Sequence, residues 1–174
     1  MAGIHPWDAA KGLSLPDFTA CDIIGETGLD YACGVSREAQ ERVFREHLLE
    51  AERLSKPIVL HVVKAFEEAM RIVGDFKIEG VVFHGFIGSK QQAARAIERG
   101  YYLSYGQRSL RSPRTCEAIE VVPLDRLFIE TDDDPNLAIA TLYEEVARLK
   151  RITPAELLQR ISNNYKRLFQ ITTT

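Results

Sequence analysis

Four side chains that can bind a metal ion follow short apolar runs in this sequence. Glu26 comes after IIG, His61 ends PIVLH, His84 ends VVFH, and Asp132 follows LFIET. Two imidazoles and two carboxylates form a mixed nitrogen and oxygen donor set that suits Zn²⁺, Mn²⁺, Fe²⁺ or Ni²⁺, and it is too poor in sulfur for a structural zinc site. The pattern favours a metal-dependent hydrolase.

The apolar runs that precede these residues are predicted strands, separated by helices. We expect strands at residues 21–25, 57–61, 80–84, 101–105 and 127–131. Helical spacing or capping signals predict helices within residues 36–55, 66–74, 89–100 and 137–150, a shorter one from residue 112, and one from residue 153. Short apolar strands alternating with amphipathic helices indicate an α/β fold with a parallel sheet.

Parallel strands joined by helical crossovers all point the same way, so their carboxyl ends share one rim. One histidine at a strand end is more often an ordinary hydrogen-bonded residue, but four candidate ligands at one rim favour a metal site. His5, at the end of the apolar stub MAGI, is an intermediate case. His47 lies beside Glu46 in a predicted amphipathic helix and is interpreted as a surface residue.

Composition excludes several other classes. The formal net charge of −3 argues against a broad basic surface for nucleic acid, and the three separated cysteines suggest reduced thiols. No apolar run approaches the roughly 18 residues of a membrane span, which favours a cytoplasmic protein without a membrane partner. The sequence has no G-x-S-x-G elbow to activate Ser104, and no dinucleotide or Walker fingerprint.

Seven motifs in order along the chain resemble those of the TatD family of metal-dependent hydrolases, some of which are deoxyribonucleases. They are GIHPW, IGETGLDY, KPIVLHVVKAFEE, VVFHGFIGS, YYLSYG, PLDRLFIETDDDP and NNYKRLF. The resemblance implies a single domain over residues 1–174 with a TIM-barrel-like (β/α) fold and one or two metals at the carboxyl rim. It also implies hydrolysis of phosphodiester bonds in DNA or in a small phosphoester.

The resemblance assigns roles to the candidate ligands. It implies that Glu26 is the carboxylate shared between two metals, and that His61 and His84 bind the second metal. It implies that Asp132 contacts the first metal and assists the attacking water, so Glu26 and Asp132 are the predicted catalytic residues.

The resemblance also points to basic residues for the substrate phosphate. Family members commonly have an arginine two residues after the histidine of the second motif, whereas this chain has Val63 followed by Lys64. Lysine can meet a phosphate as a point charge. Arg108, Arg111 and Arg114 follow another strand end, where binding of a phosphate and a solvated loop are equally consistent with the spacing.

The family's first strand carries an H-x-H pair, whereas GIHPW stands at residue 3 of this chain. We therefore expect an incomplete barrel of five strands, whose open edge invites homo-oligomers. We expect one divalent metal (Zn, Mg, Mn, Ni or Fe) held by Glu26, His61 and His84, in preference to two. The alternatives are a catalytically impaired fragment that binds or oligomerises, and an amidohydrolase acting on amides or lactones, which GETGLDY and ETDDDP disfavour.

Overall fold

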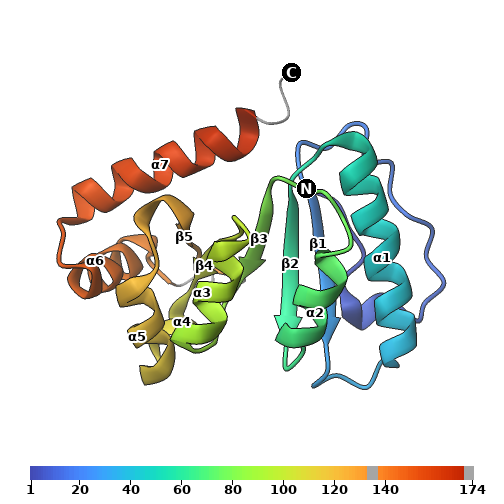
Figure 1. Ribbon diagram of the computed structural model, residues 1–174, viewed down its shortest axis with the longest axis horizontal. Helices are drawn as coiled ribbons and strands as arrows, with labels where there is room; N and C mark the ends of the chain where they lie inside the picture. The colour runs from blue at the N-terminus through green and yellow to red at the C-terminus, as the bar shows by residue number, and fades with distance from the viewer. Residues whose placement is uncertain (133–136, 171–174) are drawn as a thin grey trace. The chain divides into compact units, whose positions relative to one another are not determined.

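The computed structural model describes residues 1–132 and 137–170, and its strands form one five-stranded sheet in the order β1-β2-β3-β4-β5 (Figure 1). The strands are β1 (Ile24–Asp30), β2 (Ile58–Val63), β3 (Val81–His84), β4 (Tyr102–Tyr105) and β5 (Leu127–Ile129). β1 pairs with β2, and β4 with β5, in parallel. The predicted α/β class with a parallel sheet is confirmed.

Helices connect successive strands, as the alternating pattern predicts. The α-helices are α1 (Arg37–Leu54), α2 (Phe66–Val73), α3 (Lys90–Glu98), α4 (Gln107–Leu110), α5 (Pro113–Val121), α6 (Ile139–Lys150) and α7 (Pro154–Gln170), and the 3₁₀ turns are η1 (Pro6–Asp8) and η2 (Leu124–Arg126). None of these described helices is long and apolar enough to cross a membrane. The described residues form two compact units, the first from Met1–Phe83 with residues 168–170, and the second from His84–Arg167 without residues 133–136.

The limits of the first two strands differ from the sequence prediction. β1 continues to Asp30 and β2 to Val63, so Glu26 and His61 lie inside strands and not at their ends. The prediction ended β1 at Gly25 because glycine and a charged residue normally weaken a strand. Here β1 is buried along nearly its whole length, and pairing with β2 holds those residues in the ladder.

In the first unit, α1 packs against β1 through an apolar stripe. The helix begins after Ser36, whose side chain accepts a hydrogen bond from the Ala39 amide at 3.3 Å. Helical spacing predicts that Val43, Phe44, Leu48, Ala51 and Leu54 face inward, and the first four are buried whereas Leu54 is partly buried. The N-terminal stub also lies beside this sheet, because Ala2 forms a parallel bridge to Ile24.

His47 is fully buried in the apolar stripe of α1, so its interpretation as a surface residue is wrong. Residues four apart share a helix face, and His47 lies four positions from both Val43 and Ala51. Its Nδ1 lies 2.7 Å from the Val43 carbonyl and its Nε2 accepts the Ile4 amide proton at 2.9 Å. Burial lowers the pKa of His47, against smaller upward effects of the Val43 carbonyl and Glu46.

In the second unit, side-chain caps start three of the described helices, α3, α5 and α7, at the predicted residues. Ser89 and Gln92 form the expected capping box of α3. Ser112 caps α5, with proline in its first turn, and the Thr153 hydroxyl accepts the Glu156 amide proton at 3.1 Å before α7. The four-residue α4 was not predicted, because a single turn carries too little periodicity to detect.

We predict that the chain loses stability in mild acid partly through His47. In the folded state the pKa of the His47 imidazole lies below its ordinary value of 6.5, so His47 binds a proton more readily in the unfolded state. The stabilisation is therefore complete above about pH 6.5 and is lost as the pH falls. His47→Gln keeps one donor and one acceptor but cannot titrate, so its urea midpoint should fall less between pH 7.5 and 5.5 than that of the wild type. Equal slopes would contradict this role.

Candidate metal centre

His61 lies between two carboxylates because of the register between β1 and β2. Gly28 pairs with His61 in the parallel ladder, and Glu26 and Asp30 lie two residues to either side of Gly28. Side chains two residues apart on a strand share a face. His61 Nδ1 is 3.5 Å from Glu26 Oε1, and His61 Nε2 is 3.5 Å from Asp30 Oδ2.

Two glycines allow this approach of β1 to β2. Gly25 and Gly28 have φ angles of 125° and 142°, which side-chain-bearing residues rarely adopt. A Cβ atom at Gly25 would collide with the Val59 carbonyl, and one at Gly28 with the His61 carbonyl. The glycines of GETG therefore set the spacing between Glu26 and the strand that carries His61.

Asp30 is a buried carboxylate that is kept charged by hydrogen bonds. Burial by itself would raise its pKa, but the Trp7 indole N–H, the Ala32 amide and His61 together hold the pKa of Asp30 below its usual value. The Trp7 and Ala32 bonds measure 2.6 and 2.8 Å. A carboxylate behind the second nitrogen of a ligating histidine fixes the orientation and tautomer of that ring, which is the arrangement Asp30 offers to His61.

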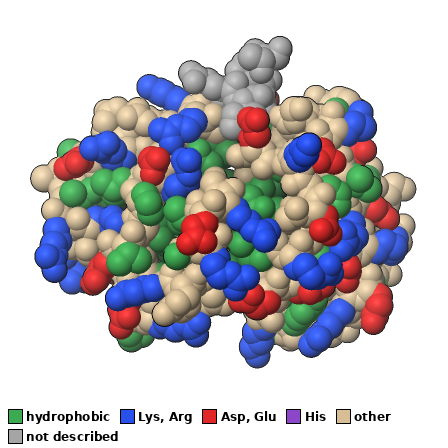
Figure 2. Space-filling view, in the orientation of Figure 1, with side chains coloured by type: hydrophobic (Ala, Val, Ile, Leu, Met, Phe, Trp, Pro, Cys, Tyr) green, Lys and Arg blue, Asp and Glu red, His purple; other side chains and the backbone are tan. Residues whose placement is uncertain are grey.

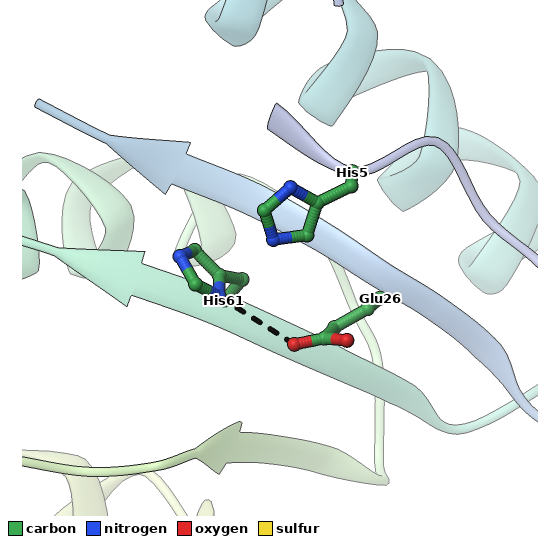
Figure 3. Close-up of side chains that lie close together, drawn as sticks. All are labelled: His5, Glu26 and His61. Atoms are coloured by element: carbon green, nitrogen blue, oxygen red, sulfur yellow. Dashed lines mark ion pairs between the residues drawn. The ribbon is translucent and has the colours of Figure 1, made fainter. Parts of the chain in front are cut away.

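His5 joins Glu26 and His61 to form a cluster of possible ligands. One ligand atom from each residue lies within 4.8 Å of the others, and Figure 3 shows the three side chains directed toward a common space. His5 caps η1, where its Nδ1 accepts the Trp7 amide proton at 3.3 Å. Burial, and then the neighbouring His61, lower the pKa of His5 against the pull of nearby carboxylates, which favours the neutral form that binds metals.

The donor chemistry of this cluster fits a divalent transition metal. Two imidazoles and one carboxylate are the protein ligands of several catalytic zinc sites, where a fourth position stays open to water. The 3.5 Å between His61 Nδ1 and Glu26 Oε1 matches the roughly 3.4 Å expected for two ligands of one tetrahedral ion with bonds of about 2.1 Å. Hard ions such as Mg²⁺ prefer an all-oxygen set, so this cluster favours Zn²⁺, Mn²⁺, Fe²⁺ or Ni²⁺.

His84 and Asp132 belong to the second unit, whereas the cluster belongs to the first. His84 ends β3 as predicted, with its Nδ1 2.9 Å from Glu130 Oε1. The same Glu130 oxygen accepts the Gly85 amide proton at 2.8 Å. Asp132 is exposed, with a φ of 54°, and the following residues of ETDDDP lie outside the described part of the chain.

The candidate phosphate-binding residues are exposed basic side chains. Lys64 follows β2 with a φ of 53°, Arg108 lies in α4, and Arg111 ends that helix. Arg114 is bound to Gln92 Oε1 at 2.8 Å, so it is less available than the other three. Figure 2 shows Lys and Arg side chains interspersed with Asp and Glu over the visible face, in agreement with the small net charge.

Sequence reasoning left His5 undecided and missed Asp30, Trp7 and Glu130. Asp30 had a detectable signal, because residues 26, 28 and 30 share one strand face once β1 is extended to its true end. Glu130 stands two residues before Asp132 and was treated as part of the strand that precedes it. Trp7 has no local signal, since its role depends on a contact with a residue 23 positions away.

A profile described as TatD related DNase matches residues 1–170. The chain belongs to the TatD family. It is 32% identical over 168 residues to a Bacillus subtilis (strain 168) protein called uncharacterized metal-dependent hydrolase YabD, over 85% of this chain and 65% of that one. It is 34% identical over 145 residues to the 3'-5' ssDNA/RNA exonuclease TatD of Cronobacter sakazakii, over 75% of this chain and 55% of that protein.

A solved structure supports the same fold. The crystal structure of a hydrolase TatD family protein from Entamoeba histolytica superposes with a TM-score of 0.82 at 19% identity, over 95% of this chain and 72% of that one. This confirms the TIM-barrel-like α/β class predicted from the sequence. The chain spans about two thirds or less of the length of the two relatives named above.

We predict that His5→Ala weakens binding of Zn²⁺ or Mn²⁺ by about tenfold or more, because it removes one of three clustered donors. Isothermal titration of protein stripped of metal measures the affinity. Glu68→Gln, which changes a partly exposed carboxylate paired with Arg71, is the control and should bind metal as the wild type does. Unchanged affinity in His5→Ala, with loss in His84→Ala, would favour the ligand set of Glu26, His61 and His84 instead.

Proposed function

We propose that this protein is a divalent-metal-dependent hydrolase of phosphodiester bonds, with nucleic acid as its substrate. The observation that carries this proposal is the cluster of His5, Glu26 and His61, whose ligand atoms lie within 4.8 Å of one another. A metal ion held there supplies Lewis acidity, which activates water at neutral pH and offsets negative charge on a phosphoryl oxygen.

The residues of the first unit have distinct proposed tasks. Glu26 and His61 are ligands, and His5 is a third ligand from the N-terminal segment. Asp30 orients the His61 ring and, because it is nine-tenths buried and hydrogen-bonded, adds negative charge that strengthens the imidazole as a donor. Lys64, exposed after β2, is proposed to attract the substrate phosphate as a point charge.

The residues of the second unit complete the proposal. His84 is proposed as a further ligand, oriented by the 2.9 Å contact of its Nδ1 with Glu130 in the same way that Asp30 orients His61. Asp132 is proposed to accept a proton from the attacking water, a task that an exposed carboxylate near a strand end can perform. Arg108 and Arg111 are proposed as additional contacts for substrate phosphates.

The relatives support a nucleic-acid substrate over the two alternatives. Family membership with proteins called metal-dependent hydrolases favours an enzyme over a protein that only binds or oligomerises. A relative named 3'-5' ssDNA/RNA exonuclease favours phosphodiester over amide or lactone hydrolysis. The number of metal ions is proposed to be one in the cluster of the first unit.

We predict that the chain stripped with EDTA does not cleave single-stranded DNA, and that Mn²⁺, Zn²⁺, Fe²⁺ or Ni²⁺ restores cleavage. Glu26→Gln should reduce kcat/KM by about a hundredfold or more, because it removes a negatively charged metal ligand, and loss of a residue that only hydrogen-bonds to a ligand already costs about 10–100-fold. Release of fluorescent nucleotide from a labelled oligonucleotide measures the rate. Glu68→Gln, the same substitution at a carboxylate that is paired with Arg71 and lies outside the cluster, serves as the matched control and should cleave as the wild type does.

Two outcomes of this assay would contradict the proposal. Cleavage that survives EDTA and Glu26→Gln would show that the activity does not depend on the cluster. Tight metal binding with no cleavage of DNA, RNA or a chromogenic phosphodiester under any of the four metals would favour a binding protein.

A further inference from the structure

Trp7 is an exposed aromatic side chain that is nevertheless held in place. Its surface is 58% exposed, yet its indole N–H donates to the buried carboxylate of Asp30 at 2.6 Å. Its ring also meets the ring of His5 edge to face, with centroids 4.8 Å apart. Single exposed apolar residues are common on protein surfaces, but this one is hydrogen-bonded to a buried charge. The indole therefore presents a flat surface whose orientation is fixed before any ligand arrives.

This surface borders the candidate metal centre. The Trp7 and His61 ring centroids are 6.2 Å apart, and the His5 ring contacts both, with centroid distances of 4.8 Å to Trp7 and 4.3 Å to His61. In a nucleotide the sugar separates the base from the phosphate by a distance of the same order. A base that rests on Trp7 would thus leave its phosphate near His5 and His61.

We propose that Trp7 is a stacking platform for an unpaired nucleobase next to the candidate metal centre. The inference rests on the proposed function, since the neighbouring cluster is taken to be the hydrolytic centre. Every base has an aromatic face, so stacking binds nucleotides with little sequence preference. A base in a duplex is stacked on its neighbours, and only an unpaired base is free to rest on a protein side chain.

The charge distribution makes such a platform useful. Proteins that hold nucleic acid by phosphate contacts need many Lys and Arg side chains on one surface. This chain has a net charge of −3, and basic and acidic side chains are interspersed over the face in Figure 2. A chain of this net charge attracts phosphates less strongly than a basic protein does, so contacts to the bases can supply a larger share of the binding.

The single tryptophan of the chain reports on this contact directly, because all indole fluorescence comes from Trp7. Hexathymidylate is titrated into the protein in EDTA, so that no hydrolysis occurs. We expect quenching of the emission on binding. A hexamer with the same phosphates but abasic sugars, which has equal charge and no stacking surface, should quench far less and bind about tenfold more weakly.

Two substitutions separate stacking from a structural role of Trp7. Trp7→Phe keeps an aromatic face but loses the N–H that binds Asp30, whereas Trp7→Leu loses both. Fluorescence anisotropy of labelled hexathymidylate should show affinity within about threefold of wild type for Trp7→Phe and about tenfold weaker for Trp7→Leu. Thermal unfolding of both variants checks that the loss of the Asp30 bond affects them equally.

The inference fails if the abasic hexamer binds and quenches as well as hexathymidylate, or if Phe and Leu at position 7 weaken binding equally. The second result would mean that Trp7 acts only by holding Asp30. These results are separate from failure of the proposed function. Absence of metal-dependent cleavage together with base-dependent quenching would keep the nucleobase site and reject the hydrolase.

Discussion

Gly28 pairs with His61 in the parallel ladder between β1 and β2, and its lack of a Cβ atom avoids a collision with the His61 carbonyl. Because Glu26 and Asp30 lie two residues to either side of Gly28, the His61 imidazole faces two carboxylates, each at 3.5 Å. The two carboxylates differ in setting: Asp30 is almost completely buried and hydrogen-bonded, whereas Glu26 is about one third exposed. Glu26 is thus available to a metal while Asp30 holds the ring.

Hydrogen bonds on both sides of His5 hold the N-terminal segment at the centre. The Ile4 amide is bound by buried His47 of α1, and the Trp7 indole is bound by Asp30 of β1. His5 lies between these two anchors and therefore has little freedom to leave the cluster. In this way the apolar stripe of α1, which carries no catalytic residue, helps to place a candidate ligand.

Much of the fold was predictable from local patterns. The approximate positions of the strands along the chain, the parallel sheet and the caps at Ser89, Ser112 and Thr153 follow from hydrophobic periodicity and from short-range hydrogen bonding. The limits of β1 were not predictable in the same way. Glycine weakens an isolated strand, but the close approach of β2 requires glycine at positions 25 and 28, and only the pairing reveals that requirement.

The sequence by itself determined the class of fold and the candidates Glu26 and His61, because strand periodicity and side-chain chemistry are local properties. Tertiary structure decided that His5 joins them, that Asp30 supports His61, and that His47 is buried. Each of these depends on contacts between residues dozens of positions apart, or on which face of a helix meets a strand. Such contacts depend on the packing of the whole unit, so they cannot be predicted from a short stretch of sequence.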